Sequence, residues 1–175
     1  MVKPRATENP PPARSLRAEQ VELTRRRILD AAGELFVSSG YTATTIEAIA
    51  RKAAVSVQTV YNAVGNKRAA LAAVYDRSLA GDDEPVPIVD RPTFRTMLTE
   101  TTARGCLTRY AELGRELAER ALPIVAVIVS EAANPDVRAL AETIEEQRAT
   151  GTRAVARHVA DRFGLRAGLD IDTAA

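Results

Sequence analysis

Apolar residues recur every three or four positions along most of the chain, a spacing that predicts helices rather than strands. The first such stripe lies within residues 19–39 and consists of four residues: Ile28, Ala32, Leu35 and Phe36. Gly40 follows at the position where a left-handed residue commonly ends a helix. The pattern therefore predicts one long helix that stops at Gly40.

Residues 44–54 predict a second, shorter helix. Thr44 and Glu47 have the spacing of a capping box, so this helix is expected to begin at Thr44. Only three residues, "AVS", separate it from another short helix. Two short helices joined by so tight a turn describe a helix-turn-helix, with the first long helix as the third wall of its core.

The second helix of this pair falls in the stretch VSVQTVYNAVGNK, residues 55–67. Ser56 can cap its start and Gly65 can end it. A helix of about two turns is too short to stand alone in water, so it must pack on its neighbours. Val60 and Val64 are spaced to face that core, which leaves these side chains for the outer surface or its margins: Val57, Gln58, Thr59, Tyr61 and Asn62.

The rest of the chain is also predicted to be helical, which makes the fold class all-α. Asn134 and Pro135 form a clear helix start, as cap and first helical residue, and Gly164 stops that helix. The segment 81–92 is acidic, contains prolines and reads as a loop. Helices are expected at about 67–79, 93–103 and 106–118, within the apolar segment 122–133, and from 134 to 163.

These boundaries divide the chain into three parts. Residues 1–18 are predicted to be a disordered basic arm rich in proline, either a plain terminus or an arm that reaches DNA phosphates. Residues 19–80 form the helix-turn-helix domain, and residues 92–175 form a C-terminal helical domain. The run TRRR at 24–27 has two interpretations, a solvated face or a contact to phosphates.

Charge and composition narrow the setting. The chain has 175 residues, with 24 basic and 23 acidic ones, so any nucleic-acid footprint must be local. Cys106 is the only cysteine, which excludes an internal disulfide and fits a reducing cytoplasm. The longest apolar run, residues 121–129, is too short to span a bilayer, which takes about 20 residues. A cytoplasmic protein without membrane association is expected.

Catalytic chemistry finds little support. The single histidine, His158, lies in the last predicted helix near no obvious nucleophile, and no close Cys/His cluster suggests a metal. No glycine-rich phosphate-binding sequence is present. We therefore expect no enzyme activity, no cofactor and no metal.

Residues 24–75 closely resemble the N-terminal domain of the TetR family of bacterial transcriptional regulators. The resemblance implies an all-α homodimer whose two recognition helices enter successive major grooves of a pseudo-palindromic operator. It also implies a C-terminal helical domain that binds a small molecule and thereby releases a repressor from DNA. The matching residues are Phe36, Gly40, Tyr41, Thr44, Thr45, Ile46, Ile49, Ala50, Val55, Ser56, Thr59, Val60, Tyr61, Lys67 and Leu71.

The resemblance also implies which residues contact the DNA backbone. Thr45, at a helix start, can offer its hydroxyl and backbone N–H to a phosphate. Tyr61 and Lys67 match family positions that bind the backbone on the far side.

The remaining exposed residues of the short helix are candidates for base recognition. Gln58 can make paired hydrogen bonds to adenine, and Val57 and the Thr59 methyl can meet a thymine methyl. Asn62 is a further polar candidate, toward base or phosphate.

A pocket between the C-terminal helices would suit an apolar or aromatic effector. Its candidate residues are Met97, Thr101, Tyr110, Val125, Val129 and Ile144.

Two departures from the family pattern carry expectations. Ala54 stands where the family usually has glycine in the turn, and a left-handed alanine would cost about 1 kcal/mol. Family members usually continue past the long helix with two helices that form the dimer bundle, whereas this sequence ends at GLDIDTAA. We therefore expect an incomplete C-terminal domain and weakened dimerisation.

Two rival functions remain open at this point. A helical protein-interaction module that does not bind DNA would show binding that barely depends on salt. A helical enzyme would need titratable residues converging in the C-terminal cavity, and it would stay active after mutation of Tyr61 or Lys67.

Overall fold

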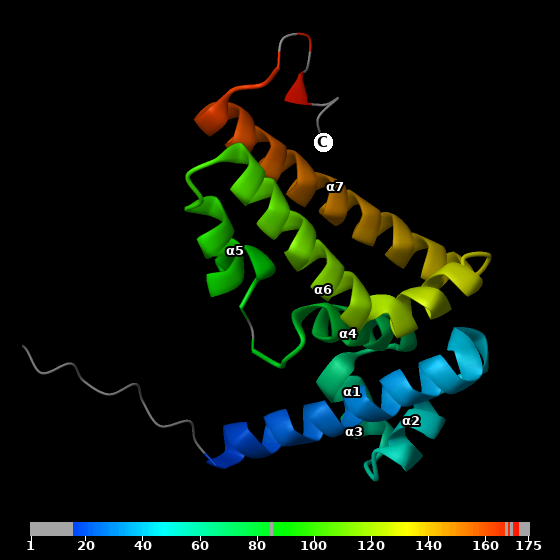
Figure 1. Ribbon diagram of the computed structural model, residues 1–175. Coiled ribbons are helices and arrows are strands. Elements are labelled where there is room, and N and C mark those ends of the chain that lie inside the picture. Colours follow the sequence, from blue (N-terminus) through cyan, green and yellow to red (C-terminus); the bar gives the residue numbers. More distant parts are fainter. Residues whose placement is uncertain (1–15, 85, 167, 169, 172–175) are drawn as a thin grey trace, which may run out of the picture.

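The computed structural model describes residues 16–84, 86–166, 168 and 170–171. These residues form helices and contain no strand, so the all-α prediction is confirmed. Figure 1 shows the arrangement. The elements are α1 (Leu16–Ala43), α2 (Ile46–Lys52), α3 (Val57–Val64), α4 (Lys67–Ala80), a short 3-10 helix η1 (Ile88–Asp90), α5 (Pro92–Leu98), α6 (Ala103–Ser130) and α7 (Pro135–Phe163).

The N-terminal helices meet the two long C-terminal helices through α4 and through α1, which also contacts α6 directly. In Figure 1, α1, α2 and α3 lie together at the bottom, and α6 and α7 run side by side above them. Helix α4 contacts both α1 and α6, and α5 packs beside α6. The helix-turn-helix therefore packs directly against the C-terminal helices and is not joined to them by a flexible linker alone.

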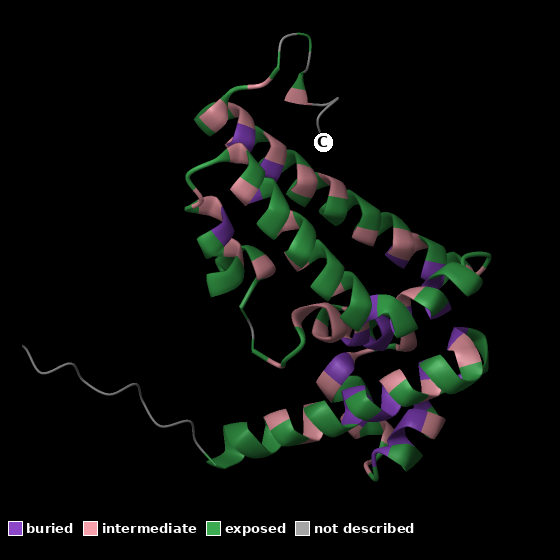
Figure 2. Cartoon of the chain, viewed as in Figure 1, coloured by how far each residue is buried: buried purple, intermediate pink, exposed green. Residues whose placement is uncertain are grey.

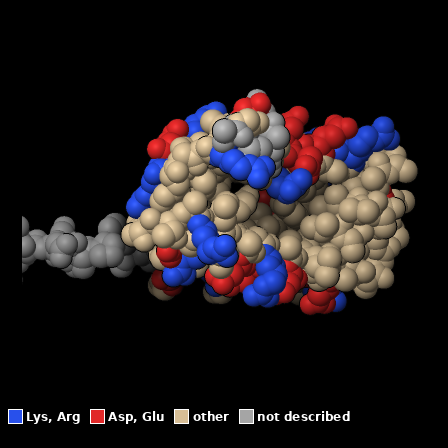
Figure 3. Space-filling view, turned by 45° about the horizontal axis from the view of Figure 1, so that its top comes forward, with Lys and Arg blue, Asp and Glu red and all other residues tan. Residues whose placement is uncertain are grey.

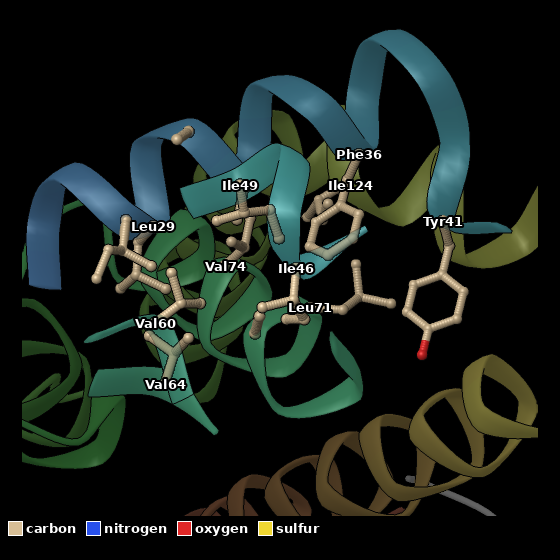
Figure 4. Close-up of a cluster of buried hydrophobic side chains, with 14 of the residues drawn as sticks. Leu29, Phe36, Tyr41, Ile46, Ile49, Val60, Val64, Leu71, Val74 and Ile124 are labelled. Atoms are coloured by element: carbon tan, nitrogen blue, oxygen red, sulfur yellow. The ribbon is translucent and has the colours of Figure 1, made fainter. Parts of the chain in front are cut away.

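Most buried residues belong to one continuous core, which we call the main core. Figure 2 shows buried positions gathered where the N-terminal helices pack together. Phe36 and Ile49 are fully buried there, beside Val60 of α3 and Leu71 of α4 (Figure 4). The same core continues into the C-terminal helices through Ile124, Val127 and Ile128 of α6 and Val137 and Leu140 of α7.

A second, smaller core lies toward the far end of α6 and α7. Its buried residues are Met97 of α5, Cys106 of α6, and Val155 and Val159 of α7. Between the two cores, α6 has mostly exposed residues from 111 to 120. Helices α6 and α7 therefore pack into a core near each of their ends and have few buried residues in the middle.

Two helix starts in the N-terminal domain differ from the sequence prediction. Helix α1 begins at Leu16, so residues 16–18 belong to a helix rather than to the predicted arm; residues 1–15 lie outside the described residues. Thr45, not Thr44, caps α2: its side chain accepts a hydrogen bond from the N–H of Ala48. Thr44 is instead buried and donates its hydroxyl to the carbonyl of Gly40, at 2.7 Å.

Two predicted helices are one. Residues 103–130 form the continuous helix α6, with Pro123 inside it, where the sequence suggested a break between 118 and 122. Pro123 is exposed, so the carbonyl that loses its N–H partner can be hydrated and the helix continues. The apolar segment after Pro123 is also not enclosed on all sides, because Val129 is 70% exposed.

Surface charge is mixed rather than gathered. Figure 3 shows Lys and Arg side chains interspersed with Asp and Glu on one face, without a large patch of one sign. Within the described ranges, no helix has the length and apolarity needed to cross a membrane.

Candidate nucleic-acid interface

Helix α3 is fixed by its caps and by two valines. The Ser56 hydroxyl accepts a hydrogen bond from the N–H of Thr59 at 3.0 Å, which satisfies one of the free donors of the first turn. Gly65 ends the helix with a φ of +80°. Val60 and Val64 are buried, as predicted, so the opposite side of α3 is turned outward.

The outer side of α3 presents polar groups to solvent. Gln58 and Asn62 are exposed and pair with each other, since the Gln58 amide donates to Asn62 Oδ1 at 2.9 Å. Tyr61 is 47% exposed. Val57 is half-buried and packs against the main core, and Thr59 is also half-buried. This bond uses one N–H of Gln58 and one lone pair of Asn62, so both amides keep further polar groups that a base edge could bind.

Thr45 and Lys67 stand at the starts of α2 and α4. Thr45 is exposed, and its hydroxyl oxygen accepts from Ala48 N–H at 3.1 Å. The Glu47 carboxylate accepts from its own backbone N–H and from the Thr45 hydroxyl, and both bonds lower the pKa of Glu47. A phosphate at Thr45 would therefore replace Glu47 as the acceptor of that hydroxyl. The Lys67 ammonium donates to the carbonyls of Tyr41 (3.0 Å) and Thr42 (3.4 Å) and lies 4.3 Å from the centre of the Tyr41 ring. Lys67 is therefore oriented by the protein before any ligand is bound.

The arginine run makes contacts within the protein that neither interpretation of the sequence included. Arg25 donates to the carbonyl of Ala63 near the end of α3, at 2.6 Å. Arg27 donates to the carbonyl of Ala53 in the turn before α3, at 2.6 Å. These two side chains hold the helix-turn-helix from both ends, while Arg26 pairs with Asp83 at 3.0 Å. The sequence did not predict this role because the acceptors are backbone carbonyls, which every residue has.

The turn between α2 and α3 contains a left-handed alanine. Ala54 has a φ of +53° and is the only non-glycine residue with positive φ among the described residues. A left-handed L-residue costs roughly 1–2 kcal/mol. Alanine at position 54, where the family usually has glycine, therefore destabilises the backbone of the turn. Arg27 also donates to the Ala54 carbonyl, at 3.3 Å.

Ala54→Gly is expected to raise the free energy of unfolding by up to about 1 kcal/mol. Glycine relieves the left-handed strain, although it loses about 0.4–1 kcal/mol through greater freedom of the unfolded chain. Urea unfolding followed by circular dichroism measures the change. The matched control is Ala53→Gly, one residue earlier, where φ is −77° and the methyl is buried; it should destabilise. A loss of stability in Ala54→Gly would contradict the strain argument.

The six predicted effector residues are spread over the C-terminal helices. Met97 and Tyr110 belong to the smaller core, where the Tyr110 hydroxyl lies 3.1 Å from the Thr152 hydroxyl. Ile144 packs against the main core. The structure brings the first two together and leaves the others apart: Val125 is half-buried, and Thr101 and Val129 are exposed.

A cavity of about 210 Å³ lies among the end of α4, the start of α5 and the middle of α6. None of the six predicted effector residues contributes to its wall. Its apolar lining comes from Ile88, Leu113 and Leu117, and its charged lining includes Arg91 and Arg120.

Groups suited to catalysis or metal binding are sparse. In the part of the chain that the structure describes, no three His, Cys, Asp or Glu side chains are grouped to hold a metal. The Nε2 atom of His158 is buried and makes no hydrogen bond within that part. Burial raises the pKa of the Cys106 thiol, which keeps the thiol protonated.

The sequence of the helix-turn-helix region matches a known family. Residues 28–74 match the model of the family described as bacterial regulatory proteins, tetR family. The match covers α2, α3 and most of α1 and α4. No curated protein matches the chain.

Solved structures with the same fold include several regulators. NalD, the secondary repressor of the MexAB-OprM multidrug efflux pump in Pseudomonas aeruginosa, is 24% identical; the match covers 88% of this chain and 77% of that one, with a TM-score of 0.59. MexZ, a key repressor responsible for antibiotic resistance in the same organism, is 24% identical over 86% and 74%, at 0.57. The TetR family transcriptional regulator PfmR from Thermus thermophilus is 22% identical over 85% and 76%, also at 0.57. The chain thus carries the N-terminal helix-turn-helix domain of the TetR family, on the all-α fold of that family's regulators.

Proposed function

We propose that this chain is a DNA-binding transcriptional regulator that inserts α3 into the major groove. The observation that carries the proposal is the exposed polar side of α3, held rigidly from behind by Val60 and Val64 and from its ends by Arg25 and Arg27. A short helix so firmly held, with unburied amide groups on its outer side, suits recognition of base edges.

Each predicted contact has a defined task in this proposal. Gln58 and Asn62 offer their amide groups to base edges, and the half-buried Val57 and Thr59 offer methyl groups to thymine. Phosphate contacts come from Thr45, Tyr61 and Lys67, which fix the position of α3 without reading sequence.

We further propose that the protein is a repressor released by a small molecule. NalD and MexZ, which share the fold, are described as repressors. In this proposal residues 19–80 bind DNA as one half of a homodimer in the cytoplasm. The C-terminal helices, residues 92–175, bind the effector, and Met97 and Tyr110 in the smaller core remain candidates to contact it.

A selected DNA duplex tests the function directly. The binding site is first selected from a random duplex library with the purified chain, and the dissociation constant is then measured across a salt series. We expect protection of two half-sites about one helical turn apart and a steep loss of affinity with salt, because bound cations displace counterions from phosphates.

Gln58→Ala is expected to weaken binding to the selected site and to relax base preference at one position, by about 1–3 kcal/mol of discrimination. The matched control is Gln147→Ala, an exposed glutamine of α7, which should bind like the parent. Failure to select any duplex, or affinity that ignores salt, would favour a protein-interaction module instead.

A further inference from the structure

The corner between α1 and α2, residues 40–44, has an unusual backbone. Gly40 has φ +81° and ψ 168°, which interrupts α1 before its last residues. Tyr41 and Thr44 are buried, and the Thr44 hydroxyl closes the corner by donating to the Gly40 carbonyl. The next residue, Thr45, caps α2 and is a proposed phosphate contact.

Two carboxylates bind this corner: Glu131 at the end of α6, and Asp136 in the first turn of α7. Both oxygens of Glu131 accept from the backbone N–H of Thr42, at 2.9 and 3.1 Å, and one also accepts from the Thr42 hydroxyl. The Tyr41 hydroxyl donates to Asp136 at 3.2 Å, and Figure 4 shows that hydroxyl directed away from Phe36. Burial, and then Asp136, raise the pKa of Tyr41 to about 12, so the phenol remains a donor.

The same corner holds the second proposed phosphate contact. Lys67 donates to the carbonyls of Tyr41 and Thr42, the residues whose other polar groups bind Asp136 and Glu131. The two carboxylates and the lysine therefore bind different polar groups of the same two residues. Moving the α6–α7 turn would move both Lys67 and the start of α2.

We infer that Glu131, supported by Asp136, is a positioning residue for DNA binding, through which the α6–α7 turn sets how well Lys67 and Thr45 meet phosphates. The inference rests on the proposed function and adds its regulation. In this inference a movement of the C-terminal helices changes the phosphate contacts of Lys67 and Thr45 without a change in α3 itself.

The corner is shaped to accept this carboxylate. A Cβ atom at position 40 would collide with the Glu131 carboxylate where it now lies, and the positive φ there also disfavours any residue but glycine. The pKa of Glu131 is held below its usual value, chiefly by the Thr42 hydroxyl, with backbone N–H groups and Lys67 adding to the effect. The carboxylate is therefore charged at neutral pH.

Glu131→Ala is expected to weaken binding to the selected duplex about tenfold or more, and to flatten the salt dependence by about one phosphate contact, with base preference unchanged. Glu131→Gln keeps one acceptor oxygen and should fall between Glu131→Ala and the parent. The matched control is Glu142→Gln, an exposed glutamate on α7, which should leave the salt dependence unchanged.

Whether the Glu131 variants bind DNA more weakly or more tightly distinguishes a positioning role from plain repulsion between the carboxylate and DNA. Removing a negative charge near DNA would by itself tighten binding, so a tighter Glu131→Gln variant would overturn the inference. A variant that melts earlier but keeps the parent's salt dependence would show a structural role only and would also overturn it. If the parent binds no duplex, the proposed function fails first, which is a different result from a parent that binds and variants that match it.

Discussion

Replacing Phe36 with alanine is expected to lower the free energy of unfolding by about 3–5 kcal/mol, the range for emptying a buried aromatic site. Phe36 is completely buried, and its ring stacks on Tyr41 with 5.8 Å between centroids. It belongs to the main core, which also contains Ile49 of α2 and Ile124 of α6. The cavity left behind would weaken the helix-turn-helix and its junction with α6 together.

Urea unfolding measured by circular dichroism gives the size of this loss. The matched control is Val37→Ala, the next residue of α1, whose side chain is 53% exposed. An exposed substitution of this kind should change the free energy by no more than about 0.5 kcal/mol. Equal effects in the two variants would mean that burial of Phe36 in the main core does not stabilise the protein as argued.

Replacing Gly40 with alanine is expected to cost about 3–5 kcal/mol of stability and to weaken DNA binding. The backbone at Gly40 lies in a region that is essentially restricted to glycine, and other residues there cost about 1–3 kcal/mol. The new methyl would also displace the Glu131 carboxylate from Thr42, and hydrogen bonds to a charged group contribute about 1.5–3 kcal/mol.

Thermal unfolding measures the stability part, and the selected duplex measures the binding part. The matched control is Gly114→Ala in α6, where an added methyl meets nothing within 4 Å. Because alanine favours a helix over glycine by about 1 kcal/mol, this control should be stabilised. If Gly40→Ala melts like the parent, position 40 does not require glycine and the account of the corner is wrong.

Local signals predicted the helices well because caps and turns act over a few residues. Ser56 and Asn134 each cap the helix that the sequence assigned to them. The neighbouring threonines 44 and 45 show the limit. Both can cap a helix, and what decides between them is the burial of Thr44 against the corner, a tertiary effect that no short window contains.

Contacts between residues far apart in the chain could not be predicted from the sequence either. Arg25 reaches a carbonyl 38 positions away and Glu131 reaches an N–H 89 positions away. Backbone groups are the same in every residue, so no residue type marks them as partners. The outer side of α3 was predictable because burial of Val60 and Val64 fixes which positions remain outside.

The main core does not stop at the loop of residues 81–92, and this limits how the protein can be recombined. Fusing residues 1–80 to a foreign sensor would strip the core of Ile124, Val127 and Val137 and leave an uncovered apolar surface on the transplanted piece. A working chimera should instead place its junctions in the thinly packed middle of α6, near residue 115, and of α7, near residue 150. The unit that could be inherited or engineered as a whole is thus the helix-turn-helix together with the adjoining halves of two later helices.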